Sequence, residues 1–227
     1  CLLKKSLQQL FETWGYDKLR SCRCLSLVIV ITMQLLSRCV VADISQEEYA
    51  ILTTVLKHGF GDTCQEVAIE EKTSAGSIAL NTGERPMPEM AELLGIPLEL
   101  LVQWEKANQE FEFLEDKFEL ACDYHIFSAA QRSKLFSTSD SANSDKSTSQ
   151  SLSPKNGWRN FKREFPNSAG MMRLAKPAID PIKNEALAYV EFDCGASCGS
   201  GRFILLNKNL EDKWQVSNGS LVWMATE

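Results

Sequence analysis

Apolar residues recur at steps of three and four in several parts of the chain, the period of an amphipathic helix. Between Ser45 and Lys57 this period predicts a helix, and Ser45 and Glu48 have the spacing of a capping box at its start. The same period predicts three further helices, at residues 97–113, 128–136 and 156–164. We therefore expect most of the helical structure to precede residue 165.

Runs of alternating or continuous apolar residues predict strands. Two such runs lie in the first half, at residues 67–69 and 118–127, and four follow later, at residues 171–178, 186–192, 202–206 and 214–224. The short connections between the last four imply an antiparallel meander rather than parallel crossovers. The predicted fold class is α+β, with the helices packed on one face of an antiparallel meander sheet of four or more strands.

The N-terminal part has the pattern of a secretory signal peptide. An apolar run, Leu25 to Leu36, follows arginines and ends before Val40-Val41-Ala42, a small-residue cleavage site. Its twelve residues would span about 18 Å as a helix, well short of the ~30 Å hydrocarbon core of a membrane. We expect residues 1–42 to be a signal peptide with a possible upstream extension, and the protein to be exported to the periplasm or the extracellular space. In the alternative interpretation, the run is a buried helix of an intracellular protein.

Composition divides the rest of the chain into three parts. Residues 43–136 are the helix-rich first half of the domain, and residues 154–227 supply a helix and the antiparallel sheet that complete the same domain. Between them, residues 137–153 are rich in serine and poor in apolar residues, which predicts a mobile loop or linker.

The charge balance argues against nucleic-acid binding. The whole chain has a net charge of −6, and removing residues 1–42 takes away six basic and two acidic residues, which leaves −10. Such a chain repels phosphate backbones and anionic membranes. We expect no nucleic-acid partner, no permanent transmembrane span and no cofactor.

Four cysteines remain beyond the predicted signal peptide: Cys64, Cys122, Cys194 and Cys198. In an oxidising compartment they allow three pairings. We favour Cys194 with Cys198, because the intervening Gly195-Ala196-Ser197 can form a tight turn that brings their Cβ atoms into disulfide range. The redox state of Cys64 and Cys122 stays open.

Several motifs together resemble a family of uncharacterised exported bacterial proteins. The motifs are Trp158-x2-Phe161-x3-Phe165-Pro166-x-Ser168-x-Gly170, Cys194-Gly195-x2-Cys198-Gly199-x-Gly201 and Lys213-Trp214-x-Val216. The resemblance covers roughly residue 45 to the end of the chain, and the sequence departs from the family in the serine-rich tract and in the loop at residues 73–88. Because that family has no established activity, the resemblance implies export and fold and implies no catalytic residue.

Ser197 is a candidate nucleophile, because Gly195-Ala196-Ser197-Cys198-Gly199 matches the G-x-S-x-G pattern of a hydrolase nucleophile elbow. That elbow joins a strand to a helix, whereas here a strand is predicted to follow. The general base would have to be His125 or His58, both of which precede the serine. A serine hydrolase therefore stays an alternative to a non-enzymatic function.

Two further interpretations involve the cysteines and glycines. Cys122 and His125 with Cys194 and Cys198 supply the residue types of a structural zinc site, which competes with the disulfide. A redox-active dithiol is disfavoured, because no helix is predicted to start at the cysteine pair and lower the pKa of a thiol. We interpret Gly195, Gly199 and Gly201 as turn glycines that permit positive φ and a bulge.

A set of aromatic residues fits either a hydrophobic core or a groove for sugars or peptides: Trp158, Phe161, Phe165, Tyr189, Trp214 and Trp223. Taken together, the patterns predict an exported protein of non-enzymatic character, a binding or envelope-associated module. The alternatives are a serine hydrolase that uses Ser197 and a small structural zinc-binding protein.

Overall fold

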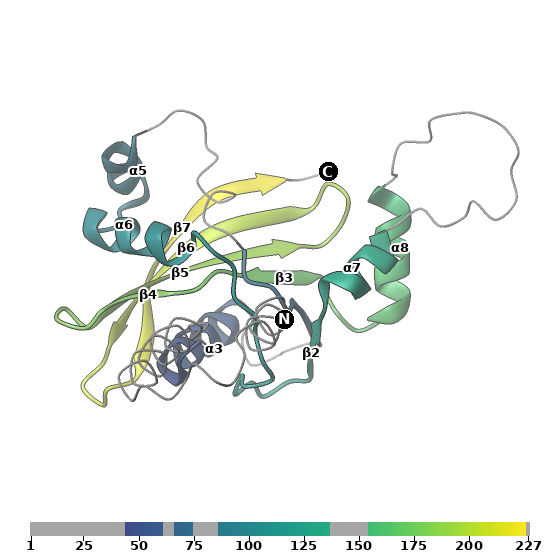
Figure 1. The fold of residues 1–227 in the computed structure, drawn as a ribbon, viewed down its shortest axis with the longest axis horizontal. Coiled ribbons are helices and arrows are strands. Elements are labelled where there is room, and N and C mark those ends of the chain that lie inside the picture. The colour runs from purple at the N-terminus through teal and green to yellow at the C-terminus, as the bar shows by residue number, and fades with distance from the viewer. Residues whose placement is uncertain (1–43, 61–65, 75–85, 137–153, 226–227) are drawn as a thin grey trace, which may run out of the picture. The chain divides into compact units, whose positions relative to one another are not determined.

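A computed structural model of the chain describes residues 44–60, 66–74, 86–136 and 154–225, and residues 44–227 form one compact unit (Figure 1). Its helices are α3 (Gln46–Phe60), α5 (Met87–Leu94), α6 (Leu98–Ala107), α7 (Ala129–Phe136) and α8 (Pro154–Glu164). Its strands are β1 (Val67–Glu70), β2 (Tyr124–Phe127), β3 (Met171–Leu174), β4 (Ala178–Asp180), β5 (Glu185–Asp193), β6 (Gly199–Lys208) and β7 (Trp214–Ala225). The predicted signal peptide and the serine-rich tract lie outside the described residues.

The seven strands form a single mixed sheet, so the predicted α+β class is confirmed and the purely antiparallel sheet is wrong. The order is β2-β1-β3-β5-β6-β7, and β4 pairs with β5 off this path. The predicted meander is present, because β5, β6 and β7 pair antiparallel. However, β1 pairs in parallel with both β2 and β3. Helices α5 and α6 lie in the long connection between β1 and β2, which makes a parallel pairing possible.

Helices cover both faces of the sheet, which corrects the expectation of one covered face. On one face, α3 packs Leu52 and Leu56 against Ala188 of β5 and Leu206 of β6. The reason lies in β5, where a continuous run from Ala186 to Phe192 is mostly buried on both sides. A strand buried on both sides needs cover above and below.

The opposite face carries two separate apolar clusters. Under α5 and α6, Trp104 packs edge to face against Tyr189 and Phe203. Under α7 and α8, Phe161 packs with Phe127 and Met171. Figure 1 shows the two helix pairs at different ends of the sheet. The part of this face over the middle strands therefore lies between the two pairs.

Three predicted elements differ in extent from the observed ones. The helix predicted at residues 97–113 ends at Ala107, and the strand predicted at residues 118–127 is regular only over its last four residues. The strand predicted at residues 171–178 is divided into β3 and β4. The capping box of α3 is confirmed, because the Glu48 backbone N–H donates to Ser45 Oγ at 3.2 Å and the Ser45 N–H donates to Glu48 Oε2 at 2.6 Å.

None of the helices in the part of the chain that the structure describes is long and apolar enough to cross a membrane.

Asn108 holds the end of α6 to the segment between β3 and β4. Its amide Nδ2 donates to the carbonyl oxygens of Trp104 at 2.9 Å and Lys176 at 2.8 Å, and its Oδ1 accepts from the Lys176 backbone N–H at 2.8 Å. We expect Asn108→Ala to lower the free energy of unfolding by about 2–4 kcal/mol, because three hydrogen bonds are lost at a buried position. Urea denaturation followed by circular dichroism measures this change.

The matched control is Asn209→Ala in the turn between β6 and β7. The Oδ1 of Asn209 also accepts two backbone N–H bonds, from Glu211 and Lys213, but both bonds are exposed to solvent. Its loss should cost no more than about 1 kcal/mol. Equal losses for the two variants would contradict the role assigned to Asn108.

Candidate functional site

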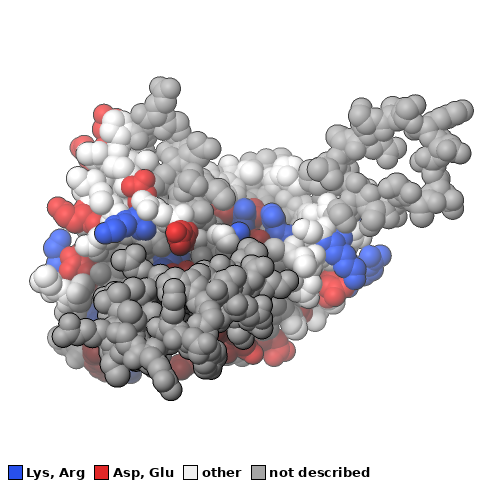
Figure 2. Space-filling model, viewed as in Figure 1, with Lys and Arg blue, Asp and Glu red and all other residues white. Residues whose placement is uncertain are grey.

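A row of charged residues crosses the sheet between the two apolar clusters. We call Glu70, Arg173 and Glu191, on the adjacent strands β1, β3 and β5, the charged row. Arg173 pairs directly with Glu191, and Glu70 follows Ile69, which pairs with Met172, the residue before Arg173. The three side chains therefore lie side by side on the face that α5, α6, α7 and α8 cover. Figure 2 shows acidic and basic atoms next to each other near the middle of the visible face.

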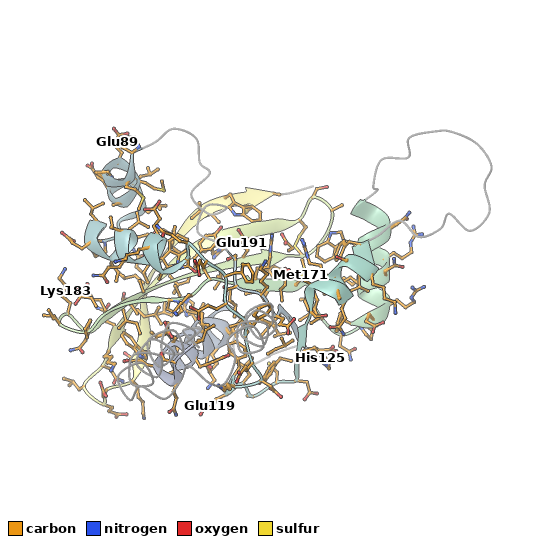
Figure 3. The ribbon with its side chains drawn as sticks, viewed as in Figure 1. Glu89, Glu119, His125, Met171, Lys183 and Glu191 are labelled. Carbon is orange, nitrogen blue, oxygen red and sulfur yellow. A yellow bond between two sulfur atoms is a disulfide. The ribbon has the colours of Figure 1, made fainter. Side chains whose placement is uncertain are left out.

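Arg173 is shared between two carboxylates of β5. Its Nη2 lies 3.0 Å from Glu191 Oε2 and 2.7 Å from Asp193 Oδ2. Glu191 is only 1% exposed, whereas the side chains of Arg173 and Asp193 keep 22% and 19% of their surface. Glu191 is thus the buried member of this group of three side chains, and Arg173 and Asp193 are its more accessible members. Figure 3 shows Glu191 over the middle of the sheet.

Tyr189 and Trp223 extend the charged row with a chain of hydrogen bonds. The Trp223 indole Nε1 donates to the Tyr189 hydroxyl at 3.0 Å, and that hydroxyl donates to Glu191 Oε1 at 2.9 Å. Burial, together with the nearby Glu191 charge, raises the pKa of Tyr189, so the hydroxyl keeps its proton and stays a donor. The chain holds the Glu191 carboxylate in one orientation.

Gly201 makes room for this chain of hydrogen bonds. It lies on β6 opposite Glu191 on one side and Trp223 on the other. A Cβ atom at position 201 would collide with Trp223 Nε1 and with the Tyr189 hydroxyl oxygen. The glycine is therefore required by the close approach of two side chains.

The turn-glycine interpretation needs a correction. Gly199 and Gly201 lie inside β6, and among the described glycines only Gly95, after α5, has a positive φ. A bulge near Gly201 is present, because the register of β6 and β7 shifts between Gly201 and Arg202. Space, rather than backbone freedom, explains both strand glycines, since a Cβ at position 199 would come within 2.9 Å of Asp193 Oδ1.

The β1 end of the charged row is loosely paired. Glu70 Oε2 lies 3.5 Å from Nε of Arg132, which α7 supplies, a distance longer than a good hydrogen bond. Within the described part of the chain, four buried atoms of this region have no hydrogen-bond partner: Glu70 Oε2, Arg132 Nε, Arg173 Nε and Glu191 Oε2. Two of them are acceptors that lie near opposite charges in poor hydrogen-bond geometry, and two are N–H donors. Buried polar atoms of this kind cost about 1–3 kcal/mol each unless a further group satisfies them.

Burial raises the pKa of Glu70, and the nearby Arg132 and Arg173 offset this only in part. The stability that this shift contributes is complete below the unfolded-state pKa near 4.5 and is lost as the pH rises through the higher folded-state pKa. We therefore expect the stability of Glu70→Gln relative to the wild type to increase from acidic to neutral pH. Urea denaturation at a series of pH values measures this difference.

The control for this experiment is Glu92→Gln on the exposed side of α5. A surface substitution of this kind is expected to change stability by less than about 0.5 kcal/mol. A Glu70→Gln difference that stays constant between acidic and neutral pH would refute the burial argument.

The cysteine hairpin lies at the end of the strand that carries Glu191 and Asp193. Cys194 and Cys198 are within disulfide distance, with Cα atoms 5.1 Å apart, and the Cys194 N–H donates to the Cys198 carbonyl oxygen at 2.9 Å. The turn between them contains Ser197, which is exposed. The hairpin therefore closes the β5–β6 connection directly beside the charged row.

The structure does not bring Ser197 and His125 together, and His58, the other candidate base, lies in the last turn of α3. His125 lies on β2, and the aligned pairs His125–Ala68, Ala68–Met171 and Met171–Asp193 separate β2 from β5 by three strand spacings, or roughly 14 Å. His125 instead contacts Glu66, with Nε2 and Oε1 3.1 Å apart. Figure 3 shows His125 beside β2, at a distance from Glu191. A strand follows Ser197 where an elbow would need a helix.

The same separation applies to the four residues considered for zinc. Cys122 and His125 lie at β2, whereas Cys194 and Cys198 lie at the β5–β6 hairpin, and ligands of one zinc ion must all lie within about 2.3 Å of it. Cys122 is also disulfide-bonded. Among the described residues, no three His, Cys, Asp or Glu side chains are grouped so that they could hold a metal ion.

The charged row was not singled out from the sequence, although signals for it exist. Glu191 and Arg173 interrupt the buried apolar segments Ala186–Phe192 and Met171–Leu174 at positions that face the covered side of the sheet. A charged residue at such a position is rare unless it is paired. The pairing itself depends on strand order, which the sequence does not specify.

Comparisons with known proteins give no match: no family model, no curated protein and no solved structure is similar to this chain.

Proposed function

We propose that the protein is an exported, non-enzymatic binding module that holds a small, neutral, hydroxyl-rich ligand at the charged row. The observation that carries this proposal is the set of four buried polar atoms without hydrogen-bond partners, which combines carboxylate acceptors with guanidinium donors in one region of the sheet. A hydroxyl group both donates and accepts, so one ligand hydroxyl can satisfy an acceptor and a donor together.

The charge of the site supports a neutral ligand. Three carboxylates, those of Glu70, Glu191 and Asp193, surround two guanidinium groups, those of Arg173 and Arg132. The positive charges are thus already paired, and an anion would approach an excess of negative charge. Sugars and related polyols have the required chemistry without a charge.

The geometry of the Glu70–Arg132 pair supports a bridging group. Their 3.5 Å separation is too long for a good direct hydrogen bond, and one oxygen atom placed beside both could bond to each of them. The Arg132 side chain is 43% exposed, so a ligand can reach it from solvent. Arg132 is therefore the most accessible anchor of the proposed site.

The non-enzymatic part of the proposal is supported by the partners of the carboxylates. Glu191 accepts from Tyr189 and lies against Arg173, and Arg173 also neutralises Asp193. The positive charge of Arg173 beside both Glu191 and Asp193 weakens these carboxylates as nucleophiles and as general bases.

Export is supported by the signal-like sequence before Asp43 and by the cysteine hairpin, since disulfides persist in oxidising compartments. N-terminal sequencing of protein recovered from the periplasm or medium of a bacterial host is expected to begin at Asp43. Recovery only from the cytosol with residues 1–42 attached would contradict export.

Binding is tested with a panel of neutral sugars: glucose, galactose, mannose, N-acetylglucosamine and trehalose. A sugar present at about 100 times its Kd adds about 2.7 kcal/mol to the free energy of unfolding, and for a domain of this size Tm should rise by roughly 5–10 °C. Thermal unfolding of the full chain with each sugar measures the shift. Glucuronate serves as the anionic comparison and is expected to bind more weakly than glucose.

The variant that tests the location is Arg132→Gln, which should weaken binding of the responsive sugar about tenfold or more, because a charged donor is lost. The control is Lys183→Gln, at the turn between β4 and β5, where the lysine side chain is 51% exposed. Figure 3 shows Lys183 at the end of the sheet away from Glu191. The proposal fails if no sugar raises Tm, or if Arg132→Gln and Lys183→Gln bind equally well.

A further inference from the structure

The structure separates the aromatic residues that fitted either a core or a groove for sugars or peptides. Four of them are buried: Phe161, Phe165, Tyr189 and Trp214. The Trp158 ring packs edge to face against Phe136 and Phe161, in the cluster under α7 and α8. Trp223 is only partly buried and lies next to the charged row, to which its indole is joined through Tyr189. Trp223 is therefore the member of this set that a ligand at the charged row can contact.

The indole of Trp223 has a fixed position over β6. Gly199 and Gly201 are two residues apart on this strand, so they face the same side of the sheet. A Cβ at position 201 would collide with Trp223 Nε1, and a Cβ at position 199 would lie 3.2 Å from Cη2, at the other end of the indole. The indole thus extends along β6 over both glycines, and the hydrogen bond from Nε1 to the Tyr189 hydroxyl holds it there. A ring that is already held in place loses little freedom when it binds a ligand.

Polar side chains lie beside this indole. The Cβ position of Gly199 is 2.9 Å from Asp193 Oδ1 as well as 3.2 Å from Trp223 Cη2, so the carboxylate and the end of the indole meet there. Arg173 pairs with Asp193, and both side chains keep part of their surface exposed. The face of an aromatic ring is negative and attracts the C–H groups on the face of a sugar ring, whose hydroxyls point outward to polar neighbours. An indole with a carboxylate and a guanidinium at its edge therefore fits a pyranose ring.

The indole lies far from the other end of the charged row. In the sheet, β1, which carries Glu70, is followed by β3, β5 and β6. Three strand spacings, or roughly 14 Å, therefore separate Glu70 from the glycines under the indole. Arg132 lies against Glu70 and is 43% exposed. A single pyranose ring is too short to contact both Arg132 and Trp223, whereas a short chain of linked rings is long enough.

We infer that the neutral ligand is a linear oligosaccharide that lies across β1, β3, β5 and β6, with one pyranose ring stacked on Trp223 and another at Arg132. This inference rests on the proposed function and adds a second contact region to the same site. Arg173 and Asp193, between the two ends, bind hydroxyl groups of the part that joins them. Because one ligand connects two contact regions, the longer sugar binds more tightly than its single ring.

Isothermal titration calorimetry on the full chain compares the β-1,4-linked trimers of glucose, mannose and N-acetylglucosamine with their monosaccharides. In the series that binds, the trimer is expected to bind about tenfold more tightly or better. Trp223→Leu removes the aromatic ring and should abolish this gain in affinity. The matched variant Trp223→Phe also loses the Nε1 donor but keeps an aromatic face, so it should keep most of the gain. Circular dichroism should show wild-type secondary structure for both variants.

Tryptophan fluorescence gives a second measurement, because a sugar stacked on the indole changes its surroundings. The trimer should change the emission of the wild type and not that of Trp223→Phe. An equal change in both proteins would overturn the inference.

The outcomes distinguish this inference from the proposed function. If none of the sugars binds, both fail. If a monosaccharide binds but no trimer binds more tightly, the inference fails and the proposed function stands. The inference also fails if Trp223→Leu keeps the gain in affinity, or if Trp223→Phe loses it to the same extent as Trp223→Leu.

Discussion

Arg173→Met is expected to lower the free energy of unfolding by about 3–5 kcal/mol, because it leaves two carboxylates without the guanidinium that neutralises them. Arg173 lies 3.0 Å from Glu191 and 2.7 Å from Asp193. Methionine fills a similar volume, so the loss reports the charge rather than a cavity. Urea denaturation of the wild type and the variant at neutral pH measures it.

The double variant Arg173→Met with Glu191→Gln separates the charge from other effects. Glu191 is the more deeply buried of the two carboxylates, so replacing its charge is expected to recover most of the stability that Arg173→Met loses. The control is Lys213→Met, which breaks an ion pair with Glu211 of 2.8 Å in which both side chains are exposed. That change should cost less than about 1 kcal/mol. A double variant no more stable than Arg173→Met would refute the explanation.

Local signals in the sequence were sufficient for much of the fold. The capping box at Ser45 and Glu48 predicted the start of α3, and the apolar runs at residues 186–192, 202–206 and 214–224 predicted the meander. These features depend on residues close together in the chain, where hydrophobic period and turn chemistry act. The cysteine hairpin was predictable for the same reason, because its partners are only four residues apart.

Features that depend on distant residues were missed. The parallel pairing of β1 with β2 joins Ile69 to Ile126, and no local pattern specifies such a contact. Helix α5 was also missed: its eight residues give barely two turns of apolar period, and its end is stabilised by Gly95 in the left-handed conformation. The charged row was missed for both reasons. Its residues come together only through the pairing of distant strands, and each is a single polar position inside its strand.

The candidate site therefore depends on the order of the strands more than on any motif. The G-x-S-x-G match at Ser197 and the four possible zinc ligands were the most visible chemistry in the sequence. However, the sheet keeps His125 three strand spacings from the cysteine hairpin that contains Ser197, Cys194 and Cys198. Glu70, Arg173 and Glu191 belong to no motif, and the same sheet makes them neighbours. Two apolar clusters share this face of the sheet, and the polar positions of the middle strands lie between them. The low dielectric of such surroundings strengthens the attraction between the paired charges.

Gly201→Ala is expected to lower the free energy of unfolding by about 2–4 kcal/mol, because it overpacks the site and breaks the partly buried hydrogen bond from Trp223 to Tyr189. In most strand positions alanine is more stable than glycine. At position 201 the added methyl group meets Trp223 Nε1 and the hydroxyl of Tyr189, which is fully buried. The expected change is thus opposite in sign to the usual one. Urea denaturation measures it, with Gly59→Ala as the comparison.

Gly59 lies in α3 and has no atom within 4 Å of the position that its Cβ would occupy. Gly59→Ala is therefore expected to raise the free energy of unfolding by about 0.5–1 kcal/mol, the ordinary gain from removing a helical glycine. A double-mutant cycle of Gly201→Ala with Trp223→Leu tests the cause, because a smaller side chain at position 223 removes one of the two collisions. The two changes should couple by about 1 kcal/mol or more. Strict additivity would mean that Trp223 does not require the glycine, and the indole would then have no fixed place in the hydrogen-bond chain that orients Glu191.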